Sequence, residues 1–134
     1  MSVSNFVAAI IPGCERGFGS CSEIGFHDDE GNLVAGVVYH NWSPETGVIE
    51  MSAGSVTRRW LTRERLKTIF AYPFEQIDCR MVVVRTSEKN GRVRRIWKSL
   101  GGKEYVIAGL RGPDEAEIII TLDREDWRAG KFTR

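Results

Sequence analysis

The sequence has little of what metal, disulfide and membrane proteins need. Its 134 residues include two histidines and three cysteines, and Cys14, Cys21 and Cys79 do not have the spacing of a zinc site. We therefore predict unreactive thiols and no metal. No apolar run approaches the roughly 20 residues that cross a bilayer, and the N-terminus lacks signal-peptide features. We accordingly expect a cytoplasmic protein without a membrane partner.

The chain is short and its net charge is close to zero, but the charged residues are unevenly distributed. A chain of 134 residues predicts a single domain, residues 1–134, without repeats or linkers. The net charge is +1, yet residues 58–103 contain 13 Lys and Arg against four acidic residues, and the remainder carries a charge of −8. The basic middle favours a polyanionic ligand, which could be a nucleotide-bearing cofactor or a nucleic acid.

Hydrophobic periodicity predicts an α/β domain with a mixed, mostly antiparallel twisted sheet of about six strands and two main helices. The expected strands are 22–28, 33–42, 48–53, 79–85, 103–108 and 115–122. The main helices are expected at 62–73 and 90–100, with shorter ones near 4–11 and 123–131. The strand, helix, strand order over 48–85 implies one parallel pair. The apolar run at 81–84 is typical of a strand that is covered on both faces.

A basic turn precedes the first main helix. Thr62 is its expected N-cap, Arg58 and Arg59 come before the cap, and Arg63 follows it. The free N–H groups and the dipole of a helix N-terminus attract anions, and guanidinium groups add forked donors. The turn therefore predicts a phosphate site. The alternative is an amphipathic helix with a solvated basic face.

The second main helix carries a motif. Residues 90–102 read NGRVRRIWKSLGG, which resembles a pattern of the GNAT superfamily of acyl-CoA-dependent N-acetyltransferases, with Gly102 where Phe is usual. The resemblance implies a GNAT-like fold and acetyl-CoA or another acyl-CoA as cofactor. It also implies that Asn90 lies near the pantetheine arm of the cofactor and that the helix, with Arg94 and Trp97, packs beside it.

The strand and basic turn at 48–66 also resemble the family. In family members, the N-terminus of the helix at this position holds the CoA pyrophosphate. The family's glycines are absent from this turn, so we expect arginine side chains to supply contacts. The resemblance spans about residues 20–122 and is closest to compact phage and prophage members with a shortened N-terminal part. It implies a possible homodimer and a cofactor site formed by Met51, Ser52, Ala53, Arg58, Arg59, Trp60, Leu61, Thr62, Arg63, Asn90, Arg94 and Trp97.

Acyl transfer to an amine needs a base and a donor to the thioester oxygen. Glu50, on the strand before the turn, is the candidate base, and the alternative for it is solvent exposure or pairing with an arginine. The resemblance places the donor among the amides of Met51, Ser52 and Ala53. It also places Trp97 where many members have a tyrosine that acts as general acid. The further catalytic candidates are therefore Tyr39, His40, Ser52, Ser55 and Tyr105, unless the acid is dispensable or the activity has been lost. A structural role is the alternative for His40.

The sequence is also compatible with two other classes of function. A nucleic-acid-directed protein, either a base modifier or a binding module, would use the basic segment 58–103 as its contact surface. Under this hypothesis, Trp60 is the one tryptophan that could be exposed beside the basic face and stack on a base. A catalytically inactive interaction protein with the same fold is the third hypothesis. The sequence does not identify the acyl acceptor, which could be a protein, a small amine or a nucleic acid.

Overall fold

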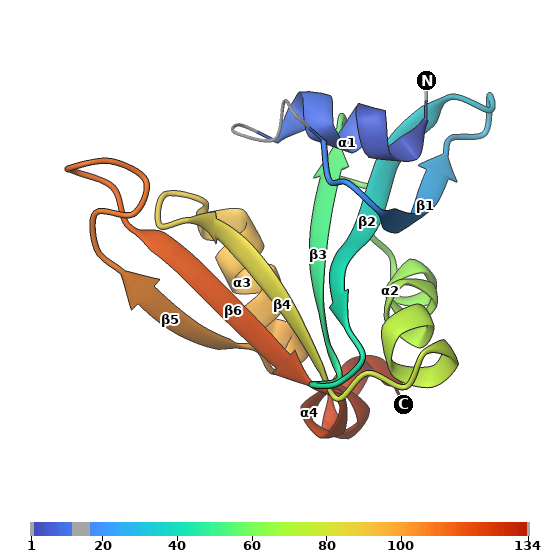
Figure 1. The fold of residues 1–134 in the computed structure, drawn as a ribbon. Coiled ribbons are helices and arrows are strands. Elements are labelled where there is room, and N and C mark those ends of the chain that lie inside the picture. Colours follow the sequence, from blue (N-terminus) through green and yellow to red (C-terminus); the bar gives the residue numbers. More distant parts are fainter. Residues whose placement is uncertain (1, 12–16, 134) are drawn as a thin grey trace.

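A computed structural model describes residues 2–11 and 17–133 (Figure 1). Cys14, one of the thiols predicted to be unreactive, lies outside this range; Cys79 is buried and Cys21 is exposed. The strands are β1 (Cys21–His27), β2 (Leu33–Ser43), β3 (Val48–Ser55), β4 (Met81–Ser87), β5 (Lys103–Ile107) and β6 (Glu117–Asp123). The helices are α1 (Val3–Ile10), α2 (Arg63–Ala71), the π-helical turn Tyr72–Gln76, α3 (Gly91–Leu100), α4 (Arg124–Ala129) and the 3-10 turn Lys131–Thr133.

The strands form one sheet in the order β1-β2-β3-β4-β6-β5, which confirms the predicted six-stranded, mostly antiparallel sheet. The one parallel pair in it is β3 with β4, as the strand, helix, strand order predicts. These two strands pair only over Val48–Glu50 and Met81–Val83. Beyond Glu50 they diverge, so that the sheet splits into two three-stranded halves (Figure 1).

Helices cover the two faces of the sheet unequally. The short helix α1 packs on β1, β2 and β3, while α2 and α3 lie on the opposite face. The close approach of α1 depends on Gly36 of β2, where a Cβ atom would lie 2.6 Å from a methyl group of Val3. On the second half, Val82 and Val84 of β4 are buried under α3, but Met81 and Val83 are only half-buried. The expectation that β4 is covered on both faces is therefore wrong, because no helix of the described chain covers its other side.

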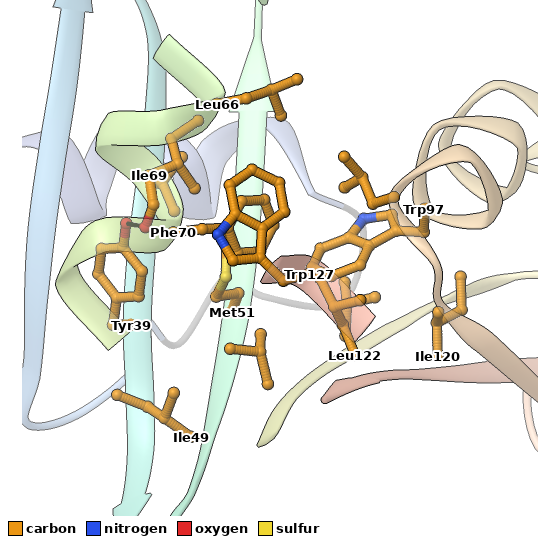
Figure 2. Packing of buried hydrophobic residues seen from close by; sticks show 14 of the residues in the cluster. Tyr39, Ile49, Met51, Leu66, Ile69, Phe70, Trp97, Ile120, Leu122 and Trp127 are labelled. Atoms are coloured by element: carbon orange, nitrogen blue, oxygen red, sulfur yellow. Dashed lines mark hydrogen bonds between the residues drawn. The ribbon is translucent and has the colours of Figure 1, made fainter. Parts of the chain in front are cut away.

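Aromatic side chains hold the helices on the sheet. Phe70 of α2 packs against Phe74, Trp97 of α3 and Trp127 of α4, with ring centroids 6.0, 5.5 and 4.7 Å away (Figure 2). All four side chains are less than 10% exposed. This cluster joins three helices around one residue and continues into the aliphatic side chains of both half-sheets.

Candidate functional site

A cleft of about 760 Å³ follows the split between β3 and β4. Its walls come from β3, β4, α2, α3, the end of α1 and the loop between β5 and β6. Of the site residues expected from sequence, the cleft brings together Glu50, Met51, Ser52, Ala53, Trp60, Leu61, Asn90 and Trp97. Tyr39, His40, Arg58, Arg59, Thr62, Arg63 and Arg94 are not part of its lining.

A polar cluster stands where the strands separate. The Nε2 atom of His40 lies 2.9 Å from the Ser52 hydroxyl and 3.8 Å from a carboxylate oxygen of Glu50. Burial lowers the pKa of His40, and the neighbouring Glu50 carboxylate offsets part of this effect. The imidazole is therefore neutral near pH 7, and a neutral ring nitrogen can accept a proton.

Asn41 belongs to this cluster, although no sequence pattern indicated it. The pairing of β2 with β3 is irregular between His40 and Ser43, and Asn41 has a φ of 53° there. Its side-chain amide donates to Glu50 at 2.9 Å. Asparagine tolerates this left-handed conformation better than most residues, and bulges often redirect a side chain beside a functional site. The bulge therefore places a donor on the Glu50 carboxylate.

The strand register also decides where the peptide groups of β3 point. The amide of Val56 donates to the Val34 carbonyl of β2 at 2.9 Å, and the register continues without a shift to the His40–Glu50 pair. Because antiparallel strands alternate in direction of hydrogen bonding, the N–H of Ser52 also points to β2. The N–H groups of Met51 and Ala53 point to the side of β4. Both follow the last β3–β4 pair, Glu50 with Val83, but Met51 is buried whereas Ala53 is exposed.

The turn before α2 forms one mouth of the cleft. Thr62 is the N-cap, as predicted, since its side chain accepts from the amide of Arg65. Arg58 and Arg59 are exposed in the turn. Arg65 donates to the carbonyls of Trp60 and His27, and this guanidinium therefore fixes the shape of the turn. Trp60 is only 7% exposed and packs on Phe26, so the expectation that it could stack on a base is wrong.

Helix α3 lines the opposite wall. Asn90 is its N-cap and accepts from the amide of Val93, while Arg92 reaches across to the Arg58 carbonyl at 2.8 Å. Arg94 instead donates twice to Glu104 of β5 and once to the Glu88 carbonyl. The Arg94 side chain is thus occupied on the outer side of the helix, because its helical position faces β5 rather than the cleft.

The Tyr39 side chain has a structural partner on α2. Its hydroxyl donates to the Ile69 carbonyl at 2.6 Å, a carbonyl that cannot accept the usual helical bond because residue 73 is proline (Figure 2). Burial raises the pKa of the Tyr39 hydroxyl far above its ordinary value. Its side chain faces the buried side of the sheet, away from Glu50 and Ser52.

Tyr39→Phe is expected to lower the free energy of unfolding by about 1–3 kcal/mol, because the buried Ile69 carbonyl would lose its partner. Urea unfolding measures this change. Tyr72→Phe is the matched control: Tyr72 packs on Tyr39, but its hydroxyl bonds the exposed Ser22 side chain. Equal losses in the two variants would contradict the structural role of the Tyr39 hydroxyl.

The cleft also contains a charged group that the sequence analysis did not predict, formed by Arg85, Arg111 and Glu117. They come from β4, the β5–β6 loop and β6, and they meet through ion pairs. Their separation of up to 32 positions gives no sequence signal. Among the described residues, no three or more His, Cys, Asp and Glu side chains are grouped so that they could hold a metal ion.

The six-stranded sheet with its split parallel pair gives the chain a GNAT-like fold, which it shares with solved acetyltransferase structures. The spermidine N-acetyltransferase SpeG of Vibrio cholerae, as its F149A mutant, superposes with a TM-score of 0.72 at 10% identity, over 83% of this chain and 70% of that one. A structure described as a probable acetyltransferase gives a TM-score of 0.67 at 17% identity, over 81% and 65%. A dodecameric structure of the Vibrio cholerae enzyme gives 0.70 at 10% identity, over 83% and 69%.

At these identities the likeness establishes the fold, and the chain spans about two thirds of these neighbours' length. No family model matches the chain, and no curated protein sequence matches it significantly. Among residues 2–11 and 17–133, no helix combines the length and apolar character required to span a bilayer.

Proposed function

We propose that this protein is an acyl-CoA-dependent N-acyltransferase that transfers an acetyl group from acetyl-CoA to an amine. The observation that carries the proposal is the cleft at the β3–β4 split, where Glu50, Ser52 and the amide of Ala53 meet. The fold neighbours support the same class of reaction, since those named here are described as acetyltransferases.

The residues present fit the parts of the proposed cosubstrate. Exposed Arg58 and Arg59 directly precede Trp60, which lines the cleft beside α2, and guanidinium groups at this place can hold a diphosphate. The cleft is also lined by Trp97, Asn90 and residues of β3, and its volume of about 760 Å³ leaves room for an extended arm. The N–H of Ala53 can donate to a thioester oxygen, which gains negative charge in the transition state.

Acyl thioesters supply an electrophilic carbonyl carbon. When the acceptor nitrogen bonds to this carbon, the carbon–sulfur bond breaks and the sulfur leaves as a thiolate. The Glu50 carboxylate accepts the proton that the nitrogen loses, and Asn41 holds that carboxylate in place. Neutral His40, through the Ser52 hydroxyl, provides a second proton acceptor 2.9 Å from that oxygen. Trp97 cannot supply a titrating proton, so the thiolate takes its proton from solvent.

Isothermal titration with acetyl-CoA tests the binding step, and thiol release in the presence of amines tests turnover. Absence of acetyl-CoA binding at high micromolar concentration would refute the acyltransferase hypothesis. The fold assignment would not change, and the hypothesis of a catalytically inactive interaction protein would be favoured.

Glu50→Gln is expected to lower kcat by about 100-fold or more, the usual contribution of a positioned base. The affinity for acetyl-CoA should not change, because Glu50 lies away from the arginine turn. Steady-state kinetics with titration calorimetry separates the two effects. Glu45→Gln, at an exposed glutamate in the β2–β3 turn, is the control. A Glu50→Gln variant with wild-type kcat would contradict the role of Glu50 as base.

Nucleic-acid binding has less support. Several cations of the basic segment are engaged within the fold: Arg65, Arg80 and Arg92 donate to backbone carbonyls, and Arg94 pairs with the Glu104 carboxylate. Fewer guanidinium groups are therefore left for phosphates. A phage-type origin, a cytoplasmic location and a homodimer stay predictions.

A further inference from the structure

An arginine pair is fixed at the end of the cleft opposite the α2 turn. Glu117 of β6 is only 4% exposed, and its two carboxylate oxygens accept from different arginines. Arg85 donates to one oxygen at 3.2 Å, and Arg111 donates to the other through Nε and Nη2 at 3.0 and 2.9 Å. One buried carboxylate thus holds two guanidinium groups beside each other, and all three residues line the cleft.

The pair lies on the same side of the sheet as the proposed base. Glu50 of β3 is in register with Val83 of β4, and parallel partners point to the same face. Two residues further along each strand, Ser52 and Arg85 therefore face the same side from opposite walls of the split. This is the side of β4 and β6 that lacks a helix in the described chain. An acceptor that reaches Glu50 from that side meets Arg85 and Arg111.

The group formed by Arg85, Arg111 and Glu117 keeps a net positive charge, because one carboxylate pairs with two guanidinium groups. Of the carboxylates beside it, Glu115 is engaged by Ser87 and Lys89, and Glu88 accepts from the amide of Ala116. A guanidinium has five N–H donors; among the described residues, Arg85 uses one and Arg111 two. Their side chains are 48% and 26% exposed, so the remaining donors are accessible. Forked donors of this kind match carboxylate and phosphate groups.

We propose that the acyl acceptor is an amine that also bears an anionic group, a carboxylate or a phosphate, which Arg85 and Arg111 bind while the amine lies at Glu50. This inference rests on the acyltransferase function proposed above. It separates the chain from its polyamine-acetylating structural neighbour, because a polycationic acceptor would be repelled by the two arginines. It also assigns a role to the β5–β6 loop, which carries Arg111.

Matched amine pairs that differ only in the anionic group test the proposal. Phenylalanine with phenethylamine probes a carboxylate, and O-phosphoethanolamine with ethanolamine probes a phosphate. Each compound is measured as an acceptor, by thiol release from acetyl-CoA, and as a ligand of the protein, by titration calorimetry. In at least one pair we expect the anionic member to have about a 10-fold or greater advantage in kcat/KM and in affinity, the effect of a charge-assisted hydrogen bond. The pair that shows it identifies the group.

The double variant Arg85→Gln, Arg111→Gln should abolish this advantage and leave acetyl-CoA affinity unchanged. Arg128→Gln, at a remote exposed ion pair with Glu75, is the control. If the double variant fails to fold, Glu117→Gln serves instead, since it releases both arginines and should retain or increase anion binding. Equal use of both members in each pair, preference for spermidine, or no anionic ligand bound at millimolar concentration would overturn the proposal. If the wild type does not bind acetyl-CoA, the proposed function is overturned. The titrations of the amine pairs without acetyl-CoA then still show whether Arg85 and Arg111 bind an anionic group.

Discussion

Phe70→Ala is expected to lower the free energy of unfolding by about 3–5 kcal/mol, the usual cost of removing a buried aromatic side chain. Phe70 is 2% exposed and contacts aromatic rings from α3, α4 and the π-helical turn. No neighbouring element can close the resulting cavity alone, because three helices converge on it. A shift in the urea midpoint at constant m-value measures the loss.

Tyr105→Ala is the control for this prediction. Tyr105 is also aromatic, but it is 54% exposed on the edge strand β5. Its replacement should change the free energy of unfolding by about 0.5 kcal/mol or less. A loss below about 1 kcal/mol for Phe70→Ala would mean that the aromatic cluster is not the centre of the core.

The double variant Arg58→Gln, Arg59→Gln is expected to weaken acetyl-CoA binding by about 100-fold. Hydrogen bonds to charged groups contribute about 1.5–3 kcal/mol each, which corresponds to roughly 10-fold or more for each arginine. The effect should be large here because the turn lacks the glycines that would let backbone amides approach a diphosphate. Titration calorimetry at fixed ionic strength measures the affinity.

Two comparisons make this result specific. Lys67→Gln removes an exposed cation from α2, the helix that follows the turn, and should have little effect. Acetyl-pantetheine lacks the diphosphate and nucleotide, so its affinity should be equal for wild type and double variant. A variant that binds acetyl-CoA as tightly as wild type would refute phosphate binding at the turn.

The fold was predictable because each element has a local signal. Alternating side chains indicate the strands, Thr62 and Asn90 mark helix starts, and Gly101 ends α3 in a left-handed conformation. The parallel β3–β4 pair follows from chain order alone, since a helix lies between these strands.

The site was only partly predictable, because side-chain partners depend on distant residues. A basic helix face does not reveal that Arg94 meets Glu104, nor does a strand pattern reveal that Tyr39 satisfies the Ile69 carbonyl. Asn41 lies between His40 and Trp42 in a stretch that reads as continuous strand, so its bulge has no local signal. Arg85 and Arg111 become neighbours only through Glu117, which the sheet register brings to them.

The narrow junction of β3 and β4 has a consequence for how the molecule stays assembled. Strands β1–β3 come from residues 21–55 and strands β4–β6 from residues 81–123, and three residue pairs join them. With so few strand pairs, the two halves depend on contacts between the helices, such as those of Phe70 with Trp97 and Trp127, to stay together. Separation of the halves would remove the shared groove, so a compound that touches both walls stabilises only the assembled molecule.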